Sequence, residues 1–188
     1  MIEFKLMKTR ICLDFSFFAV LTVFFFFNSG NALCAFMCCI FHELGHLIAM
    51  KLCGVNADRL LFYGGGIRLS AELDDRPFRV RMTVLSAGCV FNFLLALIFL
   101  FCGIIEAAVI SLFTGILNLM PFSYLDGAQI FKTMFERHSS DMRAAARSYR
   151  IFQLVVLGIA AAFAAIYGVI PDITLLFFIA YCLIVSKI

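Results

Sequence analysis

Long apolar runs with almost no charge are the feature that most limits what this chain can form. Hydrophobic residues make up 64% of the 188 residues, and charged residues only 14%. Soluble domains are nearer half apolar and a quarter charged, so this composition excludes a water-soluble globule. A membrane span needs roughly 20 apolar residues, so the apolar content is enough for about six helices. Little sequence remains for a separate soluble domain.

The runs predict an all-α integral membrane protein with six transmembrane helices in one domain, residues 1–188. The expected spans are approximately residues 11–27, 32–53, 82–102, 107–125, 151–170 and 173–186. The run from Met82 to Leu125 is too long for one crossing, so we expect it to turn near Gly103–Glu106. A basic segment before the first run is also typical of a signal peptide, but no small-x-small cleavage site follows it, so we expect the span to be retained.

Charges in the connecting segments predict the orientation of these spans. If successive connecting segments lie on alternate sides of the membrane, one side holds residues 1–10, 54–81, 129–150 and the C-terminal tail. All 15 basic residues fall on that side, with Lys51 at the edge of its span. The other side holds only Glu106 and Asp172. Basic loops remain cytoplasmic, so we expect a multi-pass protein of the cell membrane with both termini in the cytoplasm. The net charge of +3 gives no reason to expect a nucleic-acid partner.

The second apolar run contains His42-Glu43-Leu44-Gly45-His46, which predicts a metal site. Two histidines four residues apart project from one face of a helix and can share one ion. In an HExxH motif, zinc lowers the pKa of a bound water toward about 7, and the glutamate accepts its proton. Ionisable groups at membrane depth are costly and seldom idle, which favours this reading over polar contacts between helices. We expect His42 and His46 to be ligands and Glu43 to be the catalytic base.

A hydrolytic zinc site needs a third protein ligand and one open position. Several candidates lie on the far side of the membrane or among charged residues: Glu72, Glu106, Glu136 and His138. Asp126 remains, because Pro121 breaks the preceding helix and Gly127 permits a sharp turn. An N-cap role for Asp126 in the following helix is the alternative, and it is compatible with ligation.

The depths of these residues in the membrane are compatible with a shared site. His46 lies five residues before Lys51, about 7.5 Å along a helix. Asp126 lies six residues before Lys132. Both are therefore expected near the cytoplasmic ends of their spans, where water reaches the metal from the cytosol.

The eight cysteines lie in or at the ends of apolar runs and form no CxxC pair. Cysteine inside a helix usually behaves as a small hydrophobe, and this is the role we expect for them. Cys38 lies one turn before His42, so a supporting role at the metal site remains open for it.

Three motifs in order resemble those of the site-2 protease family of intramembrane zinc metalloproteases, peptidase family M50. They are HELGH at residues 42–46, SAGCVFN at residues 86–92 and NLMPFSYLDG at residues 118–127. Cys89 stands where the family motif has proline, and Ala128 stands where a second glycine is usual. The short form without a PDZ domain is most similar to the sporulation stage IV protein FB branch. That branch often ends in a nucleotide-sensing CBS domain, which we do not expect here.

The resemblance implies one zinc ion per chain, with three ligands: His42, His46 and Asp126. It also implies that Glu43 is the catalytic base, and that Asn92 and Asn118 contact the substrate or the transition state. The implied reaction is hydrolysis of a peptide bond in or near the transmembrane segment of a membrane-tethered protein. Such regulated intramembrane proteolysis would act on a regulator, such as a sporulation pro-sigma factor or an anti-sigma factor, and membrane proteins would inhibit or activate the enzyme. The competing hypothesis is a non-catalytic metal-binding scaffold or permease subunit.

The polar segment from Asp58 to Glu72 is expected to contribute to substrate binding. Residues 59–63 and 67–70 are predicted to be short strands around Gly64, Gly65 and Gly66, in a hairpin or a re-entrant loop. An unpaired strand edge there could pair with an unwound substrate helix. We count the three glycines and Pro121 among the substrate-binding candidates, and a plain cytoplasmic linker is the alternative.

Overall fold

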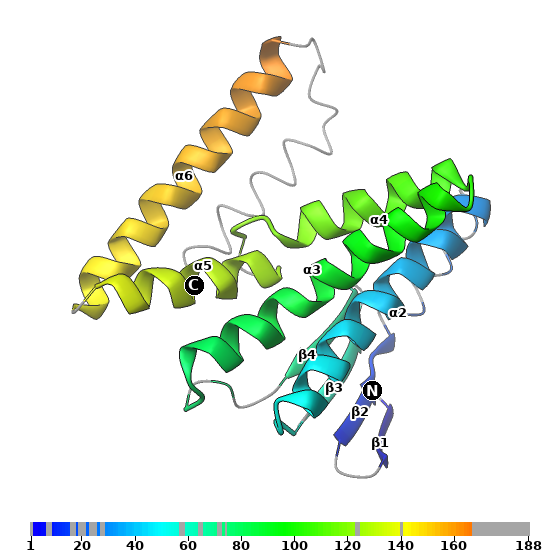
Figure 1. Ribbon diagram of the computed structural model, residues 1–188, viewed down its shortest axis with the longest axis horizontal. Helices are drawn as coiled ribbons and strands as arrows, with labels where there is room; N and C mark the ends of the chain where they lie inside the picture. The colour runs from blue at the N-terminus through cyan, green and yellow to red at the C-terminus, as the bar shows by residue number, and fades with distance from the viewer. Residues whose placement is uncertain are drawn as a thin grey trace. The chain divides into compact units, whose positions relative to one another are not determined.

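The computed structural model describes residues 2–6, 9–15, 18, 22, 26, 29–56, 59–63, 66–70, 73, 75–122, 125–139 and 141–166. Over these residues the chain is mostly helical, with five helices and a four-stranded sheet (Figure 1). The chain divides into two compact units, Met1–Asn118 and Leu119–Ile188, and each is described by itself.

The sheet belongs to the first unit. Its strands are β1 (Ile2–Leu6), β2 (Thr9–Leu13), β3 (Arg59–Tyr63) and β4 (Gly66–Ser70), which lie in this order across the sheet. The outer pairs are antiparallel, with Ile2 opposite Leu13 and Tyr63 opposite Gly66. The central strands β2 and β3 are parallel. Parallel neighbours need a long crossover, and the segment between them contains helix α2 (Ser29–Leu52).

The sheet corrects the sequence analysis at the N-terminus, where neither β1 nor β2 was expected. Ile11–Leu13 lie in β2, so the predicted span at residues 11–27 does not begin at Ile11. A hydropathy pattern counts these residues as apolar, whereas as a strand they pair with β1 on one side and with residues 60–62, far away in the sequence, on the other. The rest of that predicted span lies largely outside the described residues, as do Gly64 and Gly65.

Helix α2 ends in a motif that the sequence encodes. Gly54 has φ +66, a conformation that glycine adopts without steric cost. Its N–H donates to the Lys51 carbonyl at 3.3 Å, and the Val55 N–H donates to the Met50 carbonyl at 2.8 Å. This is a Schellman cap, in which a hydrophobic contact usually joins the same two positions. Val55 and Met50 do belong to one buried cluster with Ala49 and Val84.

Helices α3 (Phe78–Phe101) and α4 (Ile105–Asn118) pack against each other and against α2 (Figure 1). Gly103, with φ +75, turns the chain between α3 and α4. Small buried residues of α4 allow close packing, since a Cβ on Gly115 would lie 2.7 Å from Phe93. In the same interface, the Ser111 hydroxyl donates to the Asn92 carbonyl at 2.9 Å.

Two described segments are long and apolar enough to cross a membrane, judged by length and composition: Leu33–Leu52 and Phe78–Phe101. Helix α4 is apolar but shorter and ends at Asn118, so the predicted span at residues 107–125 is not one continuous helix. Large apolar side chains of α3 and α4 remain exposed: Leu94, Leu97, Ile98, Phe101, Val109 and Phe113. An exposed surface of this kind is typical of contact with lipid.

The second unit contains α5 (Asp126–His138) and α6 (Met142–Ile166). Phe131 and Phe135 of α5 pack against Phe152 of α6, with ring centroids 4.7 and 5.9 Å apart. Helix α6 begins nine residues before the predicted span at residues 151–170, because its first turns are amphipathic and hydropathy detects only the apolar part. The predicted span at residues 173–186 lies outside the described residues.

Candidate metal centre

The two motif histidines lie one turn apart on α2 and point the same way. Their side chains are almost fully buried, with 4% of His42 and 6% of His46 exposed. The two Nε2 atoms are 3.2 Å apart, and the rings meet edge to face at 78°. The helical spacing that predicted a shared ion therefore brings one nitrogen from each ring to the same point.

The other nitrogen of each ring contacts α3. His46 Nδ1 lies 2.7 Å from the Val84 carbonyl oxygen, so this nitrogen carries the proton and donates. His42 Nδ1 lies 3.2 Å from Nδ2 of Asn92, whose side chain has no exposed surface. Val84 and Asn92 are eight residues apart, with Gly88 midway, so the three form one stripe along α3. The stripe runs antiparallel to α2 and fixes the orientation of both rings.

Gly88 provides the space beside the two Nε2 atoms. A Cβ at this position would lie 2.5 Å from Nε2 and 2.6 Å from Cε1 of His42, and it would also clash with Nε2 of His46. Any larger residue at position 88 would therefore fill the point where the rings converge. Gly45 acts similarly from α2, since its Cβ would lie 2.8 Å from the Ala87 carbonyl oxygen. Each of these glycines permits close approach of the two helices.

Glu43 is partly buried, and its Oε2 atom is fully buried. Consecutive residues on a helix point about 100° apart, so this carboxylate projects beside the His42 and His46 face rather than along it. A carboxylate in this position is suited to exchange a proton near the rings while leaving them free to bind an ion.

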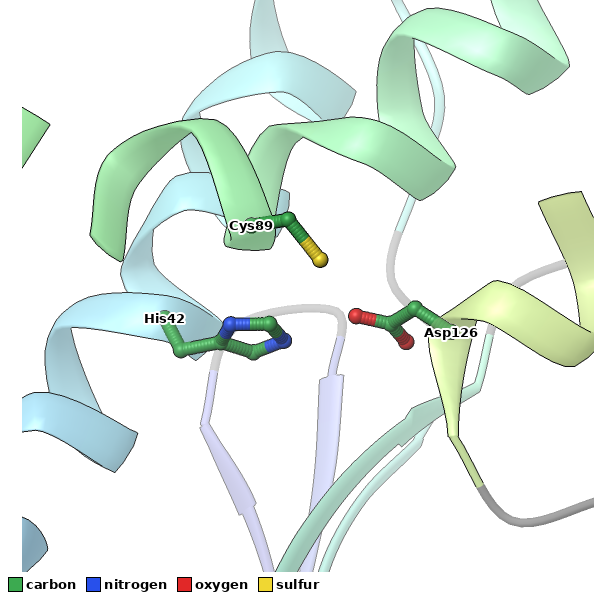
Figure 2. A group of neighbouring side chains, drawn as sticks. All are labelled: His42, Cys89 and Asp126. Carbon is green, nitrogen blue, oxygen red and sulfur yellow. The ribbon is translucent and has the colours of Figure 1, made fainter. Parts of the chain in front are cut away.

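Cys89, which follows Gly88, adds a thiol to the histidine pair. Its Sγ lies within 4.8 Å of a ring nitrogen of His42, and 1% of the residue is exposed. Figure 2 shows the sulfur projecting from α3 toward the level of the His42 ring. This position beside His42 differs from the role of a small hydrophobe that the sequence predicts. The one available signal was its occurrence inside the second motif, in place of proline.

Asp126 is the first residue of α5 in the second unit, where Figure 2 labels it. The N-cap residue is Leu125, so Asp126 does not have the capping role considered as an alternative. A carboxylate in the first turn is favoured by the helix dipole. The helix start is closely packed, because a Cβ on Gly127 would clash with the Leu119 carbonyl group. Gly127 is therefore needed here for close backbone approach.

The remaining candidate residues have structural contacts of their own. Asn118 Nδ2 donates to the Thr114 carbonyl at 3.1 Å, within α4. Pro121 is buried, and its carbonyl accepts hydrogen bonds from Tyr149 at 3.1 Å and from Gln153 at 2.5 Å. Gly66 is the first residue of β4 and pairs with Tyr63. Their roles in substrate binding stay predictions.

Comparisons with known proteins identify relatives of this chain. The curated protein named "Putative zinc metalloprotease Rip3" from Mycobacterium tuberculosis is 25% identical over 177 residues, in each of two strains. The match covers 82% of this chain, which spans 44% of the length of that relative. Among solved structures, a site-2 protease from Methanocaldococcus jannaschii matches with a TM-score of 0.67 and 19% identity. That match covers 99% of this chain and 93% of the other, and it shows a shared fold.

The model of peptidase family M50 matches residues 31–107 and 104–161. These segments contain the three sequence motifs, helices α3, α4 and α5, and most of α2 and α6. The two described helices that are long and apolar enough to cross a membrane agree with a membrane protein. With its histidine pair on α2 and Asp126 at the start of α5, this chain belongs to peptidase family M50.

Proposed function

We propose that this chain is a zinc-dependent intramembrane endopeptidase that cleaves a membrane-tethered protein within or near its transmembrane segment. The observation that carries the proposal is the 3.2 Å separation of two buried Nε2 atoms. Two nitrogen ligands of a tetrahedral zinc ion, each bound at 2.0–2.1 Å, lie about 3.3 Å apart. The pair therefore fits zinc without rearrangement of α2, and Gly88 leaves room for it.

The hydrogen bonds of His42 and His46 indicate which contact would change if zinc bound between the two rings. Because His46 Nδ1 donates to the Val84 carbonyl, His46 Nε2 presents a lone pair to His42. Without an ion, His42 can donate its Nε2 proton to that lone pair while Asn92 Nδ2 donates to His42 Nδ1. Zinc would take the place of the bridging proton. A histidine that binds metal through Nε2 donates from Nδ1, so Asn92 would then turn its amide oxygen to His42.

Asp126 is the third ligand that we propose, which gives one zinc ion per chain. The donor set is chemically suitable, since two imidazoles and one carboxylate form a common catalytic zinc site. Support comes from the third sequence motif and from the position of Asp126 in the first turn of α5. Pro121 supports the same segment, because its carbonyl is held by two side chains of α6.

Zinc bound here would polarise the scissile carbonyl and acidify a water molecule. Glu43 would accept the proton of the attacking water and return it to the leaving amine. Val84 and Asn92 would hold the two rings in place during the reaction. Burial of the rings would exclude bulk water and strengthen each of these electrostatic contacts.

The charge distribution supports a multi-pass arrangement with both termini and the active site toward the cytoplasm, because all 15 basic residues can be placed on that side. The substrate class that we propose is a tethered regulator, for example a pro-sigma factor of sporulation. An extended substrate segment could add to an outer strand of the sheet, β1 or β4, since helical peptide bonds are shielded from attack.

The test is co-expression with a reporter tethered through the transmembrane segment of a candidate pro-sigma factor. Glu43→Gln should reduce cleavage at least about 100-fold, because it removes the proton acceptor. Zinc content should remain at one ion per chain, because Glu43 is not a ligand. Glu106→Gln, which alters an exposed glutamate in the first turn of α4, is the matched control and should cleave normally.

Asp126→Ala tests the third ligand in the same assay. It should lose both zinc and cleavage, whereas Asp75→Ala, at an exposed position, should lose neither. Full zinc content in Asp126→Ala would show that another residue is the third ligand. Undiminished cleavage by Glu43→Gln would contradict the enzymatic proposal, and a non-catalytic metal-binding scaffold would then be the better account.

A further inference from the structure

We propose that Cys89 is itself a metal ligand, which binds through its thiolate and closes the resting site. This inference rests on the proposed metal site and assigns it a donor that the motif comparison did not supply. Cys89 is fixed in place by its neighbour, because Gly88 brings the α3 backbone into contact with both Nε2 atoms. The Cys89 side chain leaves α3 about 100° around the helix from that point, and its sulfur comes within 4.8 Å of a ring nitrogen of His42.

The distances are compatible with ligation. At a tetrahedral zinc ion, with S at about 2.3 Å and N at 2.0–2.1 Å, sulfur and nitrogen ligands lie about 3.6 Å apart. The Cys89 sulfur lies within 4.8 Å of a ring nitrogen of His42, so this one separation exceeds the tetrahedral value by about 1 Å at most. A change between staggered χ1 rotamers moves a cysteine sulfur by about 3 Å, so no backbone shift is needed.

A second observation supports a cation at this place. The two Nε2 atoms converge at 3.2 Å in a buried setting, although one of them must present a lone pair to the other. A buried thiol alone would be an ordinary small hydrophobe. A thiol close to one of two converging imidazoles adds a donor that zinc and other soft divalent ions prefer.

Ligation has a simple chemical balance. The Cys89 S–H bond breaks, its proton passes to solvent, and a sulfur–metal bond forms. With two imidazoles and the proposed Asp126 carboxylate, the sulfur provides a fourth protein donor. Four protein donors are typical of closed structural zinc sites, whereas hydrolytic sites keep one position open. The sulfur must therefore leave that position before hydrolysis, and removal of Cys89 should speed cleavage.

Cobalt(II) provides a readout that is independent of activity. The purified full chain in detergent is loaded with cobalt, and thiolate ligation gives an intense near-ultraviolet charge-transfer absorption. We expect this absorption in the unaltered protein and in Cys12→Ser, which alters an equally buried thiol in β2. It should be absent from Cys89→Ser and from Cys89→Ala, while visible cobalt bands persist in all four proteins.

The inference is overturned if the unaltered protein shows visible cobalt bands without the near-ultraviolet absorption, or if Cys89→Ser retains that absorption. Failure of the proposed metal site looks different, because cobalt would then bind no better to the unaltered protein than to His42→Ala.

Affinity and rate provide a second measurement. Loss of an outer partner of a zinc ligand costs about 10-fold or more in affinity, and loss of a ligand should cost at least as much. We therefore expect zinc affinity to fall at least about 10-fold in Cys89→Ala, while its cleavage of the tethered reporter becomes faster. Unchanged zinc affinity in Cys89→Ala would contradict ligation, and slower cleavage would contradict the closed resting site.

Discussion

His42 and His46 present their Nε2 atoms to each other at 3.2 Å, while α3 holds the opposite nitrogen of both rings. The α2 helix supplies the spacing of the two rings, and α3 supplies their rotation. Three residues on successive turns of α3 hold the rings. Val84 contributes its backbone carbonyl, Asn92 contributes its side-chain amide, and Gly88 leaves space because it has no side chain. The site is therefore a property of the α2–α3 interface rather than of the HELGH motif alone.

Gly88→Ala tests this interface directly. The added methyl group would lie 2.5 Å from His42 Nε2, in the space proposed for the ion. Overpacking of this kind costs about 1–3 kcal/mol, which corresponds to an affinity about 5- to 150-fold lower. Zinc titration by competition with a chelator would measure the loss. Gly30→Ala, whose methyl group would meet nothing within 4 Å, should bind zinc normally.

Asn92 should act as a positioning residue for His42. Asn92→Leu removes the contact with His42 Nδ1 and should weaken zinc binding about 10- to 100-fold, as with other partners of metal-bound histidines. Asn92→Asp keeps an oxygen that accepts the Nδ1 proton, so it should retain zinc affinity within about 10-fold of the unaltered protein. Asn31→Leu, at an exposed position of α2, is the control. Equal zinc affinity for Asn92→Leu and the unaltered protein would show that Asn92 does not position His42.

The helices could largely be anticipated from the sequence, and the sheet could not. Apolar runs with few charges give α2 and α3, because a helix of 24 residues satisfies its own backbone hydrogen bonds in lipid. Strand β2 pairs with its neighbour β1 on one side and with residues 59–62 of β3 on the other, and residues 9–13 contain no local pattern that predicts the pairing with β3. Tertiary pairing here overrides the apolar character that suggested the start of a span.

The same contrast holds within the site. The four-residue spacing of His42 and His46 is a local signal, so helical geometry alone predicts that their side chains lie on one face. The Val84 carbonyl is a backbone group, and any residue type at position 84 would carry it, so the sequence contains no trace of its role. The roles of Gly88 and Cys89 at the site can be recognised only in the structure, where α2 lies against this part of α3.

Gly127→Ala should destabilise the segment that carries Asp126. Its Cβ would meet backbone atoms, including the Met120 carbonyl oxygen at 2.5 Å, and backbone cannot move aside as a flexible side chain can. The expected cost is about 1–3 kcal/mol in the free energy of unfolding, measured by denaturant titration in detergent. Gly158→Ala on α6 meets nothing within 4 Å and should stabilise the protein slightly, by about 0.4–1 kcal/mol. A Gly127→Ala protein as stable as the unaltered chain would show that this approach is not required.

Tyr149 should make stability depend on pH in the alkaline range. Burial raises the pKa of Tyr149 from 10.0 to about 12, against the opposing effect of the hydrogen bond from Gln153. Above pH 10 the unfolded chain loses this proton before the folded chain does, so the free energy of unfolding should fall as pH rises through 12. The free energy of unfolding of Tyr149→Phe should not show this fall. At pH 8 this variant should be about 1 kcal/mol less stable than the unaltered protein, because the hydrogen bond from the Tyr149 hydroxyl to the Pro121 carbonyl is lost. Unfolding titrations between pH 8 and pH 12 measure both effects, and parallel curves for the two proteins would contradict the assignment.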